Sequence, residues 1–578
     1  MNKLRLWAPE TEEAFVLVEG QKIEMVKSGG SWWETPSEPA KHGTSYRFSV
    51  NGRDFFPDPA SCWQPKGVHG PSCFIDHSLY NWTDSNWQCP PLGSAVIYEM
   101  HTGTFSEEGT FEGAIQHLDY LVDLGVTHLE IMPVNSFAGR HGWGYDGVAL
   151  YAPHEPYGGP EGFKKLIDKC HTKGLTVILD VVYNHLGPEG NYLGKFAPYF
   201  TDKYASPWGE GINLDGPYSD EVRSFFIENA LMWMRDYHID GLRLDAVHAF
   251  VDMSATPFLE ELANAVRKLQ VSSGRRHFLI AESDLNDPRV IRPADIGGYG
   301  IDAQWSDDLH HSLHALVTGE KQDYYSDFGE ISQVAKALKN SFVYDGIYSS
   351  FRKRKHGRTP QGLPGYSFVV SLQNHDQVGN RGFGERIGHL CDPLLQMAAA
   401  ALFFTSPYIP MIFQGEEWGA SSPFLYFTDF DDEELAEMVR EGRKKEFASL
   451  KDREEDIPDP NAEETFNRSR LSWNERDQKT HSEMLSWYRK LINLRKENPC
   501  LLDGDRENTE VRFSEEEKWI LLERDRIVTV CNFSTEERTI ELEQTGSKGK
   551  ILLKSHDDLR LLERSLVLPP FCTGIIRK

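Results

Sequence analysis

The chain contains 578 residues, which at about 150 residues per domain corresponds to three or four domains. Hydrophobic residues make up 39% of it and aromatic residues 12%, a composition typical of a globular protein rather than a disordered one. There are 61 lysine and arginine residues against 88 aspartate and glutamate residues, and the formal net charge is −27. Such a surface repels phosphate backbones and anionic lipids, which excludes nucleic acid and membrane surfaces as favoured partners and leaves a neutral, polar substrate.

No targeting or membrane-spanning segment is expected. The cations Lys3 and Arg5 are not followed by the apolar stretch of a signal peptide. The uncharged run Met397–Phe413 contains two prolines and is too short to cross a bilayer, so it predicts a buried helix followed by a buried strand. The eight cysteines are scattered and form no CxxC pair, which favours free thiols over a disulfide framework or a zinc site. We therefore expect a cytoplasmic protein.

Residues 1 to about 88 show strand patterns and no helical periodicity. Short runs such as Ala14–Val18 and Tyr46–Val50 alternate with turn residues at 28–30 and 51–52. The Pro- and Gly-containing segment 88–94 has the composition of a linker. The sequence thus predicts an N-terminal β domain over residues 1–92.

From residue 93 the pattern changes to strands that alternate with helices. Helical spacing is visible over residues 111–124, 158–173, 220–237 and 257–269. Eight short apolar runs have the length of buried strands, at residues 95–100, 126–133, 175–182, 241–247, 278–281, 303–305, 367–372 and 409–413. Eight such units favour a (β/α)8 TIM barrel over residues 93–498. A doubly wound sheet is the alternative, but no Gly-rich phosphate loop follows the first strand.

The remaining segments are a long loop, a charged helix and a β-rich end. The connection after the third predicted strand runs from residue 186 to about 217, and long irregular loops in compact domains are usually functional. Its Tyr199 and Trp208 are equally compatible with sugar-stacking platforms and with packing. Residues 429–446 predict a solvated helix. Residues 499–578 return to β character and predict a C-terminal β domain.

Several predicted barrel strands end in ionisable residues. Asp180 and His185 lie at the end of the third strand or just after it, and Arg243, Asp245 and His248 lie at the end of the fourth or just after it. Glu282 follows the fifth strand, and His375 and Asp376 follow the seventh. Any one of these is explained more simply as a solvated loop residue or a structural ion pair. In a TIM barrel, however, the carboxyl ends of all strands meet at one mouth. Several carboxylates gathered there repel one another and lose solvation. Such an unfavourable cluster indicates a functional site.

The carboxyl groups have the opposed environments that glycoside hydrolysis requires. Arg243 and Asp245 are two residues apart on a strand and point to the same face, so Arg243 would hold Asp245 ionised, as a nucleophile must be. Glu282, from the next strand, would stay protonated in a drier position and act as the acid. Asp376 would be a third acid that grips sugar hydroxyls as the ring distorts.

The segments 180–185, 241–248, 282 and 374–376 resemble, in order and spacing, the four signature regions of the α-amylase superfamily of glycosidases. The resemblance covers nearly the whole chain and implies a retaining hydrolase. It implies that Asp245 is the nucleophile, Glu282 the general acid and base, and Asp376 the carboxylate that stabilises the transition state. It also implies substrate contacts from Arg243, His185, His375 and a stacking Tyr145. The β-rich ends resemble the superfamily's N-terminal carbohydrate-module-like sandwich and C-terminal antiparallel domain.

Three longer strings narrow the resemblance: AESDLNDPR at 281–289, WSDDLHH at 305–311 and QNHDQVGNRGFGER at 373–386. They resemble members that cleave the α-1,4 bond next to the terminal trehalose of a trehalose-capped maltooligosaccharide, releasing trehalose. Glucan branching enzymes are the nearest alternative, and debranching enzymes come next. A non-catalytic glucan-binding protein is a remote third, because the catalytic triad is intact.

A site that prefers trehalose as leaving group must hold both of its rings beyond the nucleophile, after strands four, six and seven. The residues expected to do so are His248, Asp307, Asp308, His310, His311, Gln377, Glu385 and Arg386. Polar groups that bind sugar hydroxyls discriminate strongly, since a wrong ligand leaves them buried and unpaired. The resemblance also implies that the chain acts in sequence with the synthase that makes the capped substrate.

No metal and no cofactor are expected. Asn184 matches a position that ligates calcium in many amylases, but companion ligands are not identifiable in the loop after the third strand. A structural hydrogen bond explains Asn184 equally well.

Overall fold

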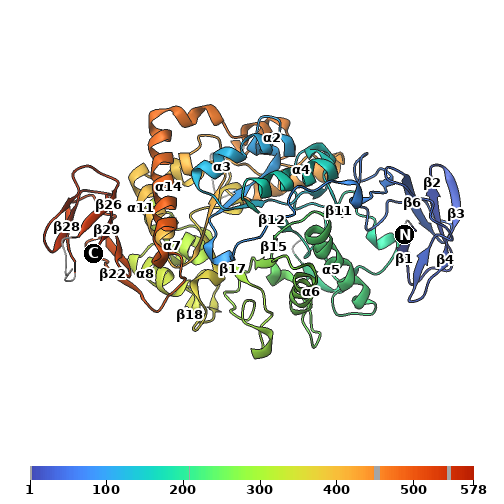
Figure 1. Cartoon of the computed structure of the whole chain (residues 1–578), viewed down its shortest axis with the longest axis horizontal. Helices are drawn as coiled ribbons and strands as arrows, with labels where there is room; N and C mark the ends of the chain where they lie inside the picture. The colour runs from blue at the N-terminus through green and yellow to red at the C-terminus, as the bar shows by residue number, and fades with distance from the viewer. Residues whose placement is uncertain (1–2, 207–208, 448–455, 543–548) are drawn as a thin grey trace.

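The structure is a computed structural model that describes residues 3–206, 209–447, 456–542 and 549–578. A central barrel with its helices lies between two β-rich ends, the N-terminal one at the right of Figure 1 and the C-terminal one at the left. The N-terminal part contains a three-stranded and a four-stranded antiparallel sheet. In sheet order their strands are β1 (Arg5–Trp7), β5 (Trp32–Glu34) and β4 (Val26–Lys27), then β3 (Gln21–Glu24), β2 (Ala14–Val18), β6 (Ser45–Val50) and β7 (Ser72–Cys73).

Eight parallel strands close into a barrel, which confirms the predicted fold class. In order around the barrel they are β8 (Ile97–Met100), β9 (His128–Ile131), β12 (Thr176–Val181), β15 (Gly241–Leu244), β16 (Phe278–Ala281), β17 (Ala303–Trp305), β20 (Phe368–Ser371) and β21 (Ile409–Phe413). All eight predicted strands are present. They could be predicted because strands that are buried on both faces appear in the sequence as short apolar runs.

Most helices also match their predictions. The helices α4 (Gly159–Thr172), α5 (Ser219–Asp236) and α6 (Phe258–Ser273) lie at the expected places, and the uncharged run forms helix α11 (Pro393–Thr405) followed by β21. The segment expected as one helix over 111–124 is instead two, α2 (Phe111–Gln116) and α3 (Leu118–Leu124). They meet at His117, whose imidazole stacks on the indole of Trp473 at a centroid distance of 3.8 Å. In the part of the chain that is described, no helix is long and apolar enough to cross a bilayer.

The long loop after β12 is more regular than expected. It contains a β-hairpin of β13 (Phe200–Ser206) and β14 (Gly209–Ile212), whose register pairs Phe200 with Ile212. Tyr199, just before it, is buried with its ring edge-on to Trp7 of the N-terminal sheets at 5.2 Å, so this tyrosine serves packing. Trp208 lies outside the described residues. The loop thus joins the barrel to the N-terminal sheets.

Three further features complete the fold. The helices α7 (Asp307–Thr318) and α8 (Ile331–Asn340) precede a hairpin of β18 (Asp345–Ser349) and β19 (Arg354–Gly357). The charged run forms α12 (Glu433–Glu446), which is largely exposed as expected. After α14 (Lys479–Glu497), the chain forms a five-stranded and a three-stranded antiparallel sheet. Their strands are β22 (Thr509–Ser514), β23 (Trp519–Arg524), β24 (Ile527–Asn532), β29 (Thr573–Arg577) and β26 (Lys550–Lys554), then β25 (Arg538–Glu541), β28 (Ser565–Leu568) and β27 (Arg560–Leu561).

Candidate active site

Three carboxyl groups meet at the carboxyl ends of the barrel strands. Asp245 directly follows β15 and Glu282 directly follows β16, and the parallel register of these two strands sets their ends side by side. Asp376 belongs to the short helix α9 (His375–Gly379), which begins four residues after β20 ends. This face of a TIM barrel is where catalytic groups stand, because loops from every strand can reach it.

Arg243 is the centre of the arrangement. Its side chain is 0% exposed, and its guanidinium lies 4.2 Å above the ring of Trp305. Nη1 donates to Asp180 Oδ2 at 2.6 Å and to Asp245 Oδ1 at 2.9 Å, and Nη2 donates to Glu282 Oε2 at 3.0 Å. A buried cation is tolerated only when it is paired and hydrogen-bonded. Three carboxyl groups around one cation leave an excess of negative charge that favours protonation of one of them.

Glu282 is the group that takes the proton. Burial raises the pKa of Glu282 to about 8; Arg243 opposes this shift, and the charges of Asp245 and Asp376 add to it. Its Oε2 accepts a hydrogen bond of 2.6 Å from the backbone N–H of Ala246. A carboxyl group with this pKa is mostly neutral at pH 7 and can donate a proton to an oxygen placed beside it.

Asp245 is held by donors. The amide Nδ2 of Asn184 donates to its Oδ2 at 2.7 Å and to its carbonyl oxygen at 2.9 Å, while Oδ1 faces Arg243. The Oδ1 atom of Asn184 lies against Nδ1 of His185. Asn184 therefore positions the Asp245 carboxylate. Among the described residues no group of three or more His, Cys, Asp or Glu side chains has the geometry of a metal site.

A stacked pair of rings extends the network to the other side of the barrel. The hydroxyl of Tyr145 donates to Asp180 Oδ2 at 2.6 Å and accepts from His375 Nε2 at 2.7 Å, with the two rings stacked at 5.1 Å. His375 Nδ1 contacts the buried carboxylate of Glu99, and Nε2 lies 3.4 Å from Asp376 Oδ2. Burial lowers the pKa of His375, but the charges of Asp376 and Glu99 outweigh it and raise that pKa to about 9. His375 is therefore a cation that donates from both nitrogens.

Comparison with known proteins shows the family to which the chain belongs. The family model for the catalytic domain of alpha-amylase matches residues 74–206. The malto-oligosyltrehalose trehalohydrolase of Saccharolobus solfataricus is 49% identical over 493 residues, covering 85% of this chain and 84% of that protein. The protein with the same name from Rhizobium sp. (strain M-11) is 42% identical over 585 residues, covering 100% of this chain and 98% of that protein. The chain belongs to the malto-oligosyltrehalose trehalohydrolase family.

A solved structure has the same fold over the full length of the chain. A putative α-amylase from Salmonella typhimurium superposes with a TM-score of 0.91 at 38% identity, covering 100% of this chain and 97% of that one. Membership of the trehalohydrolase family makes the chain a glycoside hydrolase of the α-amylase type, as expected from the four sequence regions.

Two cavities flank the cluster around Arg243. One, which we call the carboxylate cavity, has a volume of about 210 Å³ and is bordered by residues at or just after the ends of β16, β17 and β20, by residues of α7 and α9, and by the segment after α7. Its lining consists of Glu282, Trp305, Asp307, His311, Tyr324, Asn374, Asp376, Gln377 and Asn380. The other, the loop cavity, has a volume of about 370 Å³ and includes His185, Phe200 and Glu210. Four of the expected substrate contacts therefore line a cavity. Asp307, His311 and Gln377 line the carboxylate cavity, and His185 lines the loop cavity.

Three expected contacts are instead buried beneath the surface of the site. Asp308 Oδ2 accepts from the backbone N–H groups of Val343 and Tyr344 at 2.6 and 2.9 Å and from Asn286 Nδ2 at 2.9 Å. His310 donates from Nδ1 to the Leu372 carbonyl at 2.6 Å, and its Nε2 contacts the Tyr325 hydroxyl at 2.7 Å. Arg386 donates to the carbonyls of Ser422 and Gln414, each at 2.7 Å. None of the three lines either cavity, because these bonds hold them within the protein.

The last two expected substrate contacts, His248 and Glu385, line neither of the two cavities. His248 Nδ1 accepts from the backbone N–H of Asp284 at 3.3 Å, and Glu385 pairs with Arg381 at 3.3 Å. Asp284 also binds Arg352 of the β18–β19 hairpin through both carboxylate oxygens, one of them 3.0 Å from Nη1.

Sequence reasoning left several residues of the site out of the expected set. They are Glu99, Asp284, Trp305, Tyr324, Arg352 and Asn380, whereas Asp180 was expected at the barrel mouth but was given no role. The charged Glu99 within the apolar run 95–100 was an available signal, because a carboxylate inside a barrel strand has to find a partner.

Proposed function

We propose that this chain hydrolyses the α-1,4-glucosidic bond next to the terminal trehalose of malto-oligosyltrehalose, with retention, and releases trehalose and a maltooligosaccharide. The observation that carries the proposal is the sharing of Arg243 by Asp245 and Glu282. It gives two neighbouring carboxyl groups opposite protonation states, which the two halves of a retaining reaction need. The name malto-oligosyltrehalose trehalohydrolase, which the relatives from Saccharolobus solfataricus and Rhizobium sp. carry, supports the choice of substrate and product.

In the first half of the reaction, the Asp245 carboxylate attacks the anomeric carbon while Glu282 gives its proton to the departing glycosidic oxygen. The result is a glucosyl ester on Asp245 and free trehalose. In the second half Glu282, now ionised, takes a proton from a water molecule that attacks the same carbon and releases Asp245. Asp376, whose side chain is 40% exposed, is free to bind the hydroxyls of the reacting ring as it flattens.

The carboxylate cavity is proposed to bind the trehalose leaving group. Its polar groups are preset: Gln377 Nε2 donates to Asp307 Oδ1 at 3.3 Å, and the amide oxygen of Gln377 accepts from the N–H of Asn374 at 2.9 Å. Burial raises the pKa of Asp307 to about 6 although His311 opposes the shift. These groups offer both donors and acceptors to sugar hydroxyls, while Trp305 and Tyr324 offer apolar faces.

We propose that the β18–β19 hairpin forms a wall beyond the leaving group, so that the site accepts only the two glucose rings of trehalose on that side of the scissile bond. The hairpin is anchored at its base by Asp308, which binds the N–H groups of residues 343 and 344. Its turn is anchored by Arg352, which binds Asp284 two residues after Glu282. In this arrangement Asp308 is a positioning residue rather than a substrate contact.

The opposite side of the cluster is proposed to take the glucan chain. The loop cavity includes His185 beside Asn184, and its floor extends to the hairpin β13–β14. The capped glucan would come from a synthase that forms the terminal trehalose, so that the two enzymes act in sequence. A cytoplasmic location is also proposed, supported by eight cysteines that are all free thiols in the structure.

Incubation with a trehalose-capped maltodextrin, followed by chromatography of the products, tests the proposal. Free trehalose should appear much faster than maltose or glucose appears from the uncapped maltodextrin. Formation of α-1,6 branches in amylose without any trehalose would establish a branching enzyme instead. Glucan binding without turnover would establish a binding protein.

A further inference from the structure

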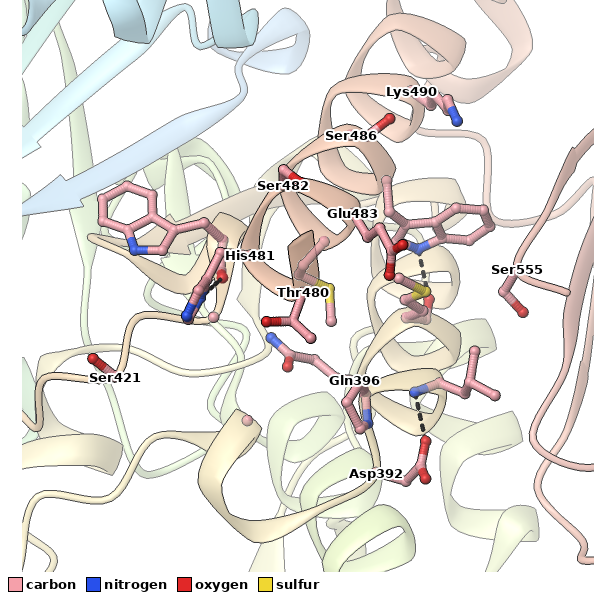
Figure 2. A pocket seen from close by; sticks show the side chains of 18 of the residues that line it. Asp392, Gln396, Ser421, Thr480, His481, Ser482, Glu483, Ser486, Lys490 and Ser555 are labelled. Carbon is pink, nitrogen blue, oxygen red and sulfur yellow. Dashed lines mark hydrogen bonds between the residues drawn. The ribbon is translucent and has the colours of Figure 1, made fainter. Parts of the chain in front are cut away.

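A third cavity lies outside the Arg243 cluster, between barrel helices and the C-terminal sheets (Figure 2). Its volume is about 880 Å³, against about 210 Å³ for the carboxylate cavity. Four segments that are distant in sequence build it: 388–397, 418–421, 480–490 and 554–557. The volume is in the range of about 300–1,000 Å³ that ligands of drug size occupy, which includes short oligosaccharides.

The walls come mainly from two helices, together with the segment 418–421 and a turn of the C-terminal domain. Asp392 caps α11 by accepting from the N–H of Leu394 at 2.8 Å, and the first turns of α11 and α14 both face the cavity. In Figure 2, Gln396 of α11 and Thr480 and Glu483 of α14 gather at the centre, with Ser555 at one end. The cavity is therefore part of the packing of the C-terminal domain on the barrel.

The lining offers both hydrogen-bond donors and hydrogen-bond acceptors, and its positive and negative side chains are nearly equal in number. The hydroxyls of Thr480, Ser486 and Ser555 can act in both senses. Nδ1 of His481 donates to the Trp418 carbonyl at 2.8 Å, which leaves Nε2 of a neutral ring as an acceptor. Two lysines stand against three carboxylates: Lys490 and Lys554, and Asp392, Glu483 and Asp557. Such a set does not select an anion or a cation.

The cavity also has apolar surface next to these polar groups. Met397, Met484 and Trp487 line it, and the Trp487 indole is fixed by a bond of 3.0 Å from Nε1 to the Met397 carbonyl. Gln396 lies between the two kinds of surface; it is 2% exposed, and its Nε2 makes a long contact of 3.5 Å with the Glu416 carbonyl. Apolar faces beside a mixture of donors and acceptors match the apolar faces and the hydroxyl rim of a sugar.

We infer that this cavity is a second carbohydrate site, which binds a short neutral α-linked glucose oligosaccharide without cleaving it. No lining residue belongs to the cluster around Arg243, so the site is separate from the one that performs hydrolysis. The ligand chemistry is shared by a linear maltooligosaccharide and by trehalose. The volume favours the linear oligosaccharide, because it exceeds that of the cavity proposed to hold trehalose.

Calorimetric titration of the Asp245→Asn variant with maltotetraose tests the inference, since that variant is expected to bind sugar without consuming it. Two sites per chain are expected. In the double variant Asp245→Asn, Ser486→Trp, the indole fills the cavity, and the second site should weaken by at least tenfold while the first is unchanged. The matched control is Ser272→Trp, at an exposed serine near the end of α6, which should keep both sites. A parallel titration with trehalose shows which sugar the cavity prefers.

One binding site in the Asp245→Asn variant, or two sites of unchanged affinity in the filled variant, would overturn the inference. Competition by inorganic phosphate at the second site would overturn the assignment to a neutral sugar. If circular dichroism shows that Ser486→Trp does not fold, Ser482→Trp serves in its place, because Ser482 is exposed at the rim. Binding stoichiometry does not depend on trehalose release, so a failure here is distinguishable from a failure of the proposed reaction.

Discussion

Asp245 and Glu282 are bonded to the two terminal nitrogens of one guanidinium, Nη1 of Arg243 at 2.9 Å and Nη2 at 3.0 Å. The relationship fixes how far apart the two carboxyl groups can lie, because both are tied to the same rigid planar fork. We expect a crystal structure to show them about 5–5.5 Å apart, as retention requires. A separation of about 6.5–9.5 Å, which leaves room for a water molecule, would indicate inversion instead.

Replacement of the nucleophile is the most direct test of the assigned roles. Asp245→Asn should lower kcat by about a thousandfold or more, which is about 4 kcal/mol of barrier, because an amide cannot form the glucosyl ester. Steady-state release of trehalose measures the effect, and circular dichroism checks that the fold is kept. Asp295→Asn, at an exposed position of a short 3-10 turn, is the matched control and should keep normal activity. Near-normal turnover by Asp245→Asn would end the assignment.

The pH profile should report the proton on Glu282. That proton must be present for the leaving group to depart, and burial raises the pKa of Glu282 to about 8, so kcat/KM should fall as pH rises through about 8. Asp245 must be ionised, which produces a second limb on the acid side and a bell-shaped profile that belongs to the coupled pair. Glu282→Gln should remove the alkaline limb together with most of the rate. An unchanged bell in this variant would show that another group is the acid.

A buried ion cluster beneath the barrel should make stability depend on pH. The imidazole of His171 lies between Asp84 and Asp240, at 2.9 Å from Nδ1 and 3.0 Å from Nε2. Burial lowers the pKa of His171, but the bonds to Asp240 and Asp84 outweigh it and raise that pKa above its ordinary value of 6.5. The protonated histidine therefore stabilises the fold fully below pH 6.5, and the contribution is lost as pH rises through the raised pKa.

His171→Gln should thus lower the free energy of unfolding by about 3 kcal/mol at pH 6, the cost of breaking a buried ion pair, and by less at pH 9. Urea unfolding at the two pH values measures the difference. As the control, His556→Gln, in a surface turn of the C-terminal domain, should leave the free energy of unfolding unchanged at both pH values. An equal loss at both pH values would mean that His171 acts without its proton.

The barrel and the place of its acidic residues were predictable for a physical reason that does not apply to the rest of the site. Strands buried on both faces read as apolar runs, and ionisable residues directly follow their carboxyl ends, so Asp245 and Glu282 could be placed at the barrel mouth from the sequence. Their roles as nucleophile and acid are what the resemblance to the α-amylase superfamily implies. Asp308 looked equally suited to contact the substrate, because it follows β17 closely. In the structure it binds the N–H groups of residues 343 and 344, and no local sequence pattern predicts that these residues lie next to it. Glu99 was missed because an inward-facing carboxylate inside an apolar run is read as an interruption rather than as a partner for His375.

The preference for a trehalose leaving group should separate a residue that touches the sugar from one that holds the wall. His311 lines the carboxylate cavity, whereas Asp308 is buried and accepts two backbone hydrogen bonds at the base of the β18–β19 hairpin. Both His311→Ala and Asp308→Ala should shrink the ratio of kcat/KM for capped over uncapped maltooligosaccharide more than they harm cleavage of the uncapped one. They should differ in stability, since Asp308→Ala leaves two buried N–H groups without their acceptor, at a cost of about 1–3 kcal/mol.

The expected pattern is therefore a lower ratio with an unchanged Tm for His311→Ala, and a lower ratio with a reduced Tm for Asp308→Ala. Arg352→Gln tests the same wall from its other end, because it removes the charge that binds Asp284 while the hairpin base stays anchored. It should lower the ratio and add cleavage one sugar further from the capped end, since the wall no longer stops the leaving side after two rings. Chromatography of products from capped maltodextrin reads both effects. If Arg352→Gln and Asp308→Ala release trehalose with wild-type preference, the hairpin does not set the length of the leaving group, and the cavity residues alone must do so.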